Sequence, residues 1–231
     1  MKKVGIALLA MLVLGGCSMN YKADIDYTDR GVVVAGAEPV INRVEVMDER
    51  GTDPHWLGAI RGGFGNRLKT LRTEDKTEVV VQVAYTEALK RSGLFTESDS
   101  APYRLQVVLT KFDCSYYFNR EAHAHAEVAL IDNRTSRKVY SRSYRTDEVE
   151  PGVGAGIFGD VETLRALAET AMTKNINKMF YDGYLVKRLS STPSLNNTTK
   201  RLKKVEALYG GGLISERDYR KRRAQILSEA Y

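Results

Sequence analysis

The stretch that decides the fold is Ala122-His123-Ala124-His125-Ala126-Glu127-Val128-Ala129-Leu130-Ile131. Small and apolar residues alternate with polar ones over most of it, which is the period of two of a strand with one buried face. Two further strand-like runs flank it at 103–112 and 138–146, and the connections 113–121 and 132–137 are short. Short connections favour antiparallel neighbours, because parallel strands need a longer crossover. We therefore predict a three-strand antiparallel meander.

Two segments are predicted to be helices that cover one face of this sheet. Residues 77–93 place several apolar side chains on one helical face, with Thr77 as a plausible N-cap and Gly93 at the C-terminal end. A second helix begins after the N-cap Asp160 and carries an apolar stripe at helical spacing as far as Phe180.

The remaining pattern completes the predicted fold class. Short strands are expected at 31–36 and 40–47, and a long polar, glycine-rich connection at 48–76. The prediction is an α+β fold: a mainly antiparallel sheet, made of the three-strand meander plus N-terminal strands, with two helices packed on one face. A C-terminal helical hairpin follows it.

The N-terminus indicates export. Lys2 and Lys3 precede an unbroken run of apolar and small residues that ends at Leu14-Gly15-Gly16-Cys17. The run is shorter than the roughly 20 residues that a membrane span needs, so residues 1–16 are interpreted as a signal peptide. An ordinary signal peptide with a chance cysteine at its end is the alternative.

Leu14-Gly15-Gly16-Cys17 resembles the lipobox of bacterial lipoproteins. The resemblance implies cleavage before Cys17 and attachment of three acyl chains, palmitate among them, which anchor far more firmly than one. Because Ser18 rather than aspartate follows the cysteine, it also implies the periplasmic face of the outer membrane. Residues 17–30 are polar and lack a clear period, so we expect a lipidated tether.

Net charge differs between the C-terminal segment and the rest of the exported chain. Residues 200–231 contain nine Lys and Arg against four Asp and Glu, a net charge of +5, whereas the formal charge of the whole chain is +6. Without Lys2 and Lys3, the body is left near −1. The basic tail suits an anionic lipid surface or an acidic partner, and export excludes nucleic acid. We expect a periplasmic domain at 31–189, a polar linker at 190–199 and a hairpin at 200–231.

The last thirty or so residues resemble the SHOCT motif, a short helical hairpin at the ends of many bacterial proteins. The match runs from Leu202-Lys203-Lys204-Val205-Glu206-Ala207-Leu208-Tyr209 through Gly212-Leu213-Ile214-Ser215-Glu216-Arg217-Asp218-Tyr219 to Ala224-Gln225-Ile226-Leu227. The resemblance implies oligomerisation or docking without catalytic residues. A hairpin this small buries little surface alone, so we expect a homo-oligomer or a docked partner. The candidate residues are Leu202, Val205, Leu208, Tyr219, Ile226 and Leu227.

The body is similar to YajG-like periplasmic lipoproteins. The similarity rests on the early valine-rich strand, the stretch 62–68, the helix ending Leu89-Lys90-Arg91-Ser92-Gly93, and the meander followed by an amphipathic helix. The similarity implies an envelope protein, and it implies no enzymatic activity. The SHOCT-like appendage departs from that family.

His123 and His125 stand two apart on a predicted strand and point the same way. Such a pair can bind zinc or copper through neutral imidazoles. A third ligand is needed, however, and His55 is the one other histidine of the chain. Because the alanine face holds the core, we interpret the histidines as part of a solvated face and expect no metal and no cofactor, with metal binding as the weaker alternative.

Four apolar residues on loops are candidate partner contacts: Trp56, Phe64, Ile157 and Phe158. Neither glycine-rich stretch, at 61–67 or at 152–159, fits a phosphate loop. No nucleophile with a base partner is recognisable, so no enzyme is predicted. The leading hypothesis is a non-catalytic, lipid-anchored module that contacts an envelope protein during assembly or transport; the alternative is a small-ligand or metal-binding lipoprotein.

Overall fold

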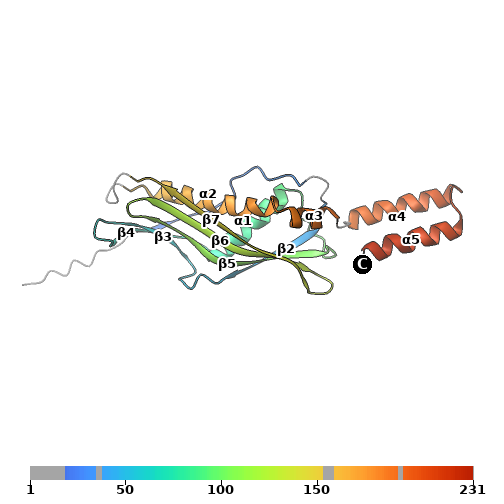
Figure 1. Ribbon diagram of the computed structural model, residues 1–231, viewed down its shortest axis with the longest axis horizontal. Coiled ribbons are helices and arrows are strands. Elements are labelled where there is room, and N and C mark those ends of the chain that lie inside the picture. The colour runs from blue at the N-terminus through green and yellow to red at the C-terminus, as the bar shows by residue number, and fades with distance from the viewer. Residues whose placement is uncertain (1–18, 35–37, 153–158, 192–194, 231) are drawn as a thin grey trace, which may run out of the picture.

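One twisted sheet, two helices on one of its faces and a projecting helical hairpin make up the molecule (Figure 1). The structure is a computed structural model that describes residues 19–34, 38–152, 159–191 and 195–230. The strands are β1 (Met19–Lys22), β2 (Ile41–Asp48), β3 (Trp56–Arg61), β4 (Arg67–Arg72), β5 (Tyr103–Tyr116), β6 (Arg120–Asp132) and β7 (Lys138–Glu150). The helices are α1 (Thr77–Arg91), α2 (Val161–Phe180), α3 (Gly183–Ser191), α4 (Leu195–Gly210) and α5 (Glu216–Ala230).

The sheet is mixed. Its order is β1-β4-β3-β5-β6-β7, and β2 pairs with β5 off this path. The pairs β3–β4, β5–β6 and β6–β7 are antiparallel. The pairs β1–β4, β2–β5 and β3–β5 are parallel. The long strand β5 therefore pairs with β2 along its first half and with β3 near its end.

The predicted fold class is wrong: in place of a mainly antiparallel sheet with two helices, the described chain forms a seven-stranded mixed sheet and five helices. The main omission is the β3–β4 hairpin, which lies within the segment 48–76 predicted to be a connection. Its alternation is disturbed by irregular pairing at Trp56/Gly58 and at Ile60/Arg61. The parallel pairs were missed because β2 and β3 join β5 only after the chain has passed through β4 and α1, which supplies the long connection that parallel pairing needs.

Gly58 sets how closely β3 approaches β5. It stands opposite Cys114 in the parallel register, and the Cys114 side chain is buried. A Cβ on residue 58 would lie 2.1 Å from the Cys114 carbonyl oxygen and 2.6 Å from its Sγ. Glycine at this position therefore lets the two backbones meet.

We predict that Gly58→Ala lowers the free energy of unfolding by about 1–3 kcal/mol or more, because β3 must move away from β5. Gly63→Ala is the matched control, since a Cβ there meets nothing within 4 Å. Urea denaturation of the two variants and the parent provides the comparison. Equal midpoints for Gly58→Ala and Gly63→Ala would contradict the close approach.

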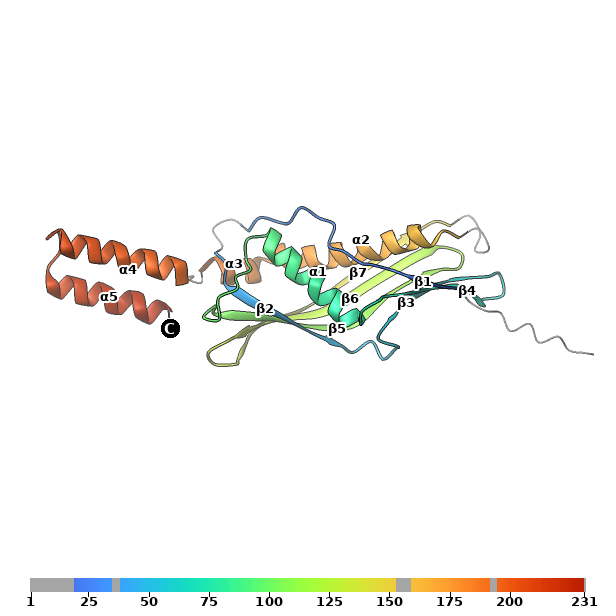
Figure 2. The same cartoon turned by 180° about the vertical axis from the view of Figure 1, so that it is seen from behind.

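The core lies between the sheet and the helices α1 and α2 (Figure 2). Ala122, Ala124 and Ala126 of β6 are buried beneath α2, which presents its own buried Ala168 and Ala171. The small side chains on both surfaces allow a close contact. Within the core, the Asn175 amide of α2 donates to the Ala124 carbonyl oxygen at 2.6 Å.

Residues 19–30, predicted to belong to a tether, are packed on the domain. After β1, the side chains of Ala23, Ile25 and Tyr27 are buried. The backbone N–H of Asp26 donates to Glu169 of α2 at 3.1 Å. The alternation of these apolar residues with Lys22, Asp24 and Asp26 is the period of two that the sequence analysis overlooked.

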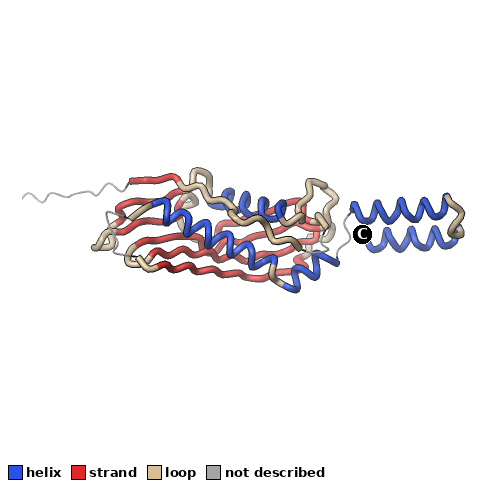
Figure 3. Tube along the Cα trace, turned by 90° about the horizontal axis from the view of Figure 1, so that it is seen from above, coloured by secondary structure: helices blue, strands red, loops and turns tan. Residues whose placement is uncertain are grey.

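The predicted linker 190–199 also requires correction. Helix α3 continues to Ser191 and α4 begins at Leu195. The helical hairpin therefore starts earlier than the predicted residue 200. In Figure 3 the hairpin continues beyond the end of the sheet.

Asp182 joins the sheet to α3 at that end. Its side chain is 1 % exposed and pairs with Arg142 of β7. It also accepts hydrogen bonds from the Tyr144 hydroxyl at 3.3 Å and from the backbone N–H groups of Tyr184 and Leu185 at 2.9 and 3.1 Å. Burial by itself raises the pKa of this carboxyl group, but the hydrogen bonds from Arg142 and the α3 backbone outweigh burial and lower the pKa to about 2.

We predict an acid-sensitive contribution from Asp182. Because its folded-state pKa is depressed, its carboxylate stabilises the fold above about pH 4, and this contribution is lost as the pH falls toward 2. Asp182→Asn should lower the free energy of unfolding at neutral pH by about 2 kcal/mol. Near pH 2 the difference in free energy of unfolding between the variant and the parent should be smaller. Urea denaturation of both proteins at several pH values tests this. A difference in free energy of unfolding that stays constant from neutral pH to pH 2 would contradict it.

Candidate functional site

The predicted contact residues fall in different surroundings. Cys17, Ile157 and Phe158 lie outside the described residues. Trp56 begins β3 instead of standing on a long loop, and the Arg67 guanidinium covers its ring at 4.4 Å from the centroid. Phe64, in the turn between β3 and β4, is fully exposed at 101 %. Of the candidates within the described residues, Phe64 is therefore the one that the structure presents fully to solvent.

Phe64 belongs to a group of exposed apolar residues at one end of the sheet. We call this group the apolar tip; its members are Met19, Phe64, Phe118 and Val149. Met19 pairs with Lys69 beside the β3–β4 turn. The β5–β6 turn reaches the same place, because the Tyr117 hydroxyl donates to the Gly63 carbonyl oxygen at 3.0 Å. Val149 pairs with Glu121 just beyond that turn.

Basic side chains accompany the apolar tip. Arg61 and Arg67 face each other in register at the β3–β4 turn. Lys69 follows on β4, where its ammonium donates to the Gly159 carbonyl oxygen at 2.9 Å. An apolar group with adjacent cations is the combination that suits an anionic lipid surface.

The α4–α5 hairpin lies at the opposite end of the molecule (Figure 1). Of the six residues proposed for oligomerisation, Val205 and Ile226 are buried, whereas Leu202, Leu208, Tyr219 and Leu227 are half-buried. The rings of Tyr209 and Tyr219 stack at 4.7 Å between the two helices. Ser215 caps α5, since the Asp218 backbone N–H donates to its hydroxyl oxygen at 3.1 Å. Within the described chain, no helix combines the length and the apolar character of a membrane span.

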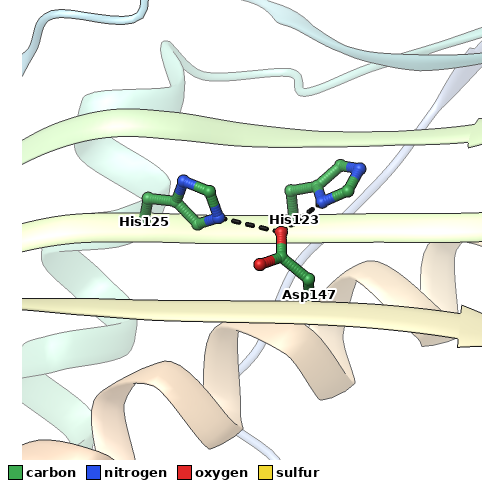
Figure 4. A group of neighbouring side chains, drawn as sticks. All are labelled: His123, His125 and Asp147. Carbon is green, nitrogen blue, oxygen red and sulfur yellow. Dashed lines mark hydrogen bonds and ion pairs between the residues drawn. The ribbon is translucent and has the colours of Figure 1, made fainter.

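The two histidines of β6 meet a third residue that the sequence analysis missed. Figure 4 shows His123, His125 and Asp147 converging on the sheet face away from α2. His123 Nδ1 lies 2.5 Å and His125 Nε2 lies 2.9 Å from the same Asp147 Oδ1. The two histidine side chains are each 20 % exposed and the aspartate side chain is 51 % exposed. We call these three residues the histidine cluster.

The strand register explains the convergence. His123 stands directly opposite Asp147 in the antiparallel β6–β7 pair, and His125 follows two residues along the same face. The two imidazole hydrogen bonds lower the pKa of the Asp147 carboxyl group. The signal in the sequence was weak, because Asp147 becomes a neighbour only after β6 and β7 are aligned residue by residue. His55, the histidine considered as a third ligand, instead contacts the Thr73 carbonyl oxygen at 3.2 Å.

Comparison with solved structures places the fold among known bacterial proteins. XCC0632 from Xanthomonas campestris, described under the family model DUF330, is similar with a TM-score of 0.50 at 14 % identity over 74 % of this chain and 97 % of that one. PelC from Paraburkholderia phytofirmans, described as a dodecamer, gives 0.35 at 15 % identity over 64 % and 92 %. Lipoprotein GNA1162 from Neisseria meningitidis gives 0.25 at 15 % identity over 59 % and 97 %.

The likeness to XCC0632 concerns the fold alone. No protein-family model matches the chain, and no curated protein matches it.

Proposed function

We propose that this chain is a non-catalytic, lipid-anchored lipoprotein of the bacterial envelope that presents the α4–α5 hairpin to a protein partner. The lipobox-like stretch Leu14-Gly15-Gly16-Cys17 supplies the anchor. Ser18 after the cysteine favours the outer membrane, with the domain on the periplasmic side. The role would be in envelope assembly or transport.

The observation that carries this proposal is that β1 and the α4–α5 hairpin lie at opposite ends of the molecule (Figure 2). Cys17 precedes Met19, the first residue of β1, by two residues. Helix α2 begins beside the same end, where Lys69 contacts Gly159. It then runs for 20 residues, about 30 Å at the usual helical rise. The hairpin follows beyond its far end.

A short connection to the lipid would bring the apolar tip to the bilayer. Because residues 19–30 are packed on the domain, Ser18 alone separates β1 from the lipidated cysteine. Phe64 and Phe118 would enter the interface, and Arg61, Arg67 and Lys69 would lie at the level of the head groups. The tip thus supports an orientation with the hairpin pointing away from the membrane.

The hairpin has the properties of a contact module. Its internal contact buries Val205 and Ile226, and it leaves Tyr209 and Leu213 exposed at 42 % and 74 %. Its net charge of +5 favours an acidic surface on a partner or on another copy of the chain. Since the turn that carries Leu213 is the part of the hairpin farthest from the sheet (Figure 1), it is the first part that a partner meets.

The anchor is tested by replacing the two cysteines separately. Cys17→Ala should lose the acyl mass and move almost entirely from the membrane pellet to the soluble fraction, because the thiol that receives the lipid is gone. Cys114→Ala is the control and should stay in the pellet, since Cys114 is a buried core residue. Mass spectrometry and membrane flotation provide the measurements. An unchanged lipid mass in Cys17→Ala would overturn the anchor.

The orientation is tested by photo-cross-linking in living cells. A photoreactive residue at Leu213 should give a discrete protein adduct, whereas the same residue at Phe64 should give phospholipid adducts. An adduct between two copies at Leu213 would assign the hairpin to self-association, and an adduct with another protein would identify the partner. Protein adducts at Phe64 together with lipid adducts at Leu213 would show the reverse orientation and contradict the proposal.

A further inference from the structure

The histidine cluster has the composition and the convergence of a metal site. His123 Nδ1, His125 Nε2 and an Asp147 carboxylate oxygen are ligand atoms that all lie within 4.8 Å of one another. Two imidazole nitrogens with one carboxylate oxygen form a donor set that zinc and related divalent transition metals accept. Three protein ligands also leave a coordination position open.

The three side chains are already close to binding geometry. Zinc–nitrogen and zinc–oxygen bonds of about 2.0–2.2 Å in a tetrahedral arrangement separate neighbouring ligand atoms by about 3.4 Å. The two nitrogens now lie 2.5 and 2.9 Å from Asp147 Oδ1. Side-chain movements of about 1 Å would therefore admit an ion between them. The supporting strands are held by continuous antiparallel pairing from Arg120 to Leu130, so the backbone need not move.

Carboxylates surround the His123 side of the cluster. Glu121 Oε2 lies 4.0 Å from His123 Nε2, the nitrogen that does not face Asp147. This is an ion-pair distance and too long for a hydrogen bond; a side-chain movement of about 1 Å would let the carboxylate accept the second N–H of the ring and fix the tautomer whose Nδ1 binds a metal. Asp113 of β5 stands opposite His123 in register and adds negative charge. Lys111 and Arg145 stand opposite His125, so the attraction for a cation is concentrated at His123.

We propose that the histidine cluster binds a divalent transition-metal ion of the zinc class through His123 Nδ1, His125 Nε2 and the Asp147 carboxylate. The ion would occupy the open face of the sheet, opposite α2 and between the anchored end and the hairpin. This inference is independent of the lipid anchor and of the hairpin's partner. It adds a ligand-binding site to the interaction module.

The test uses the full-length protein purified in detergent without a histidine tag. Equilibrium dialysis against Zn²⁺ alone, followed by elemental analysis, should give one zinc ion per chain. Asp147→Asn and His125→Ala should each weaken the affinity more than about tenfold, because loss of even an outer partner of a metal ligand costs about 10–100-fold. His55→Ala, which removes the histidine outside the cluster, should bind as the parent does.

Circular dichroism of each variant establishes that it is folded. The side chains of the cluster lie on the open face, so their replacement should leave the spectrum unchanged. A parent protein that takes up no zinc would overturn the proposal. Equal affinities of the parent and of both folded cluster variants would overturn it as well, and a loss of zinc in His55→Ala alone would move the site away from the cluster.

Discussion

The close contact between the alanine stripe of β6 and helix α2 is the constraint on which the rest of the structure depends. Ala122, Ala124 and Ala126 are buried and present no side chain longer than a methyl group to the helix. The Asn175 amide can therefore reach the backbone of β6, and its oxygen accepts from the Tyr85 hydroxyl of α1 at 3.4 Å. This buried hydrogen-bond chain ties both helices to the central strands, and an unpaired member would be costly in the core. The position of α2 then determines the two ends of the molecule, because its N-terminus lies beside β4 and its C-terminus leads into α3.

The same alternation that buries the alanines exposes the histidines. Successive residues of a strand point to opposite faces, so a stripe of Ala122, Ala124 and Ala126 requires a second stripe with His123 and His125 among its members. The core and the histidine cluster are thus two results of one pattern. Since the alanine face is held by α2, the register of β6 cannot slip by one residue without placing imidazoles in the core. The packing that stabilises the fold therefore also keeps His123 opposite Asp147.

The sequence predicts the elements that have a regular local period. It does not predict the features that depend on which strands pair with each other. The alternation of β6 and the apolar stripe after Asp160 each have a regular period, and both elements could be placed from it. Strand β3 could not, because Gly58 interrupts its apolar run and irregular pairing disturbs its register. The parallel pairing of β2 and β3 with β5 could not be predicted either, because the residues of these strands do not indicate which strand they pair with. Asp147 was missed for a related reason: its role follows from cross-strand register, which no single segment reveals.

The two outermost strands, β1 and β7, oppose strand addition, which agrees with the proposed role of the hairpin as the contact surface. An exposed edge strand can pair with another chain, and proteins oppose this with charged side chains and short edge strands. Edge strand β7 carries Lys138, Arg142, Arg145 and Asp147 along its length, and β1 at the other end of the order has 4 residues. Addition of a strand from another chain is thus disfavoured at β7 and at β1, while β2, which pairs with β5 off this path, is a further edge. The α4–α5 hairpin is helical, so the backbone groups within each helix are paired internally and the proposed contacts would form through side chains. Their specificity would then depend on the fit of the exposed Tyr209 and Leu213 and on the basic charge around them.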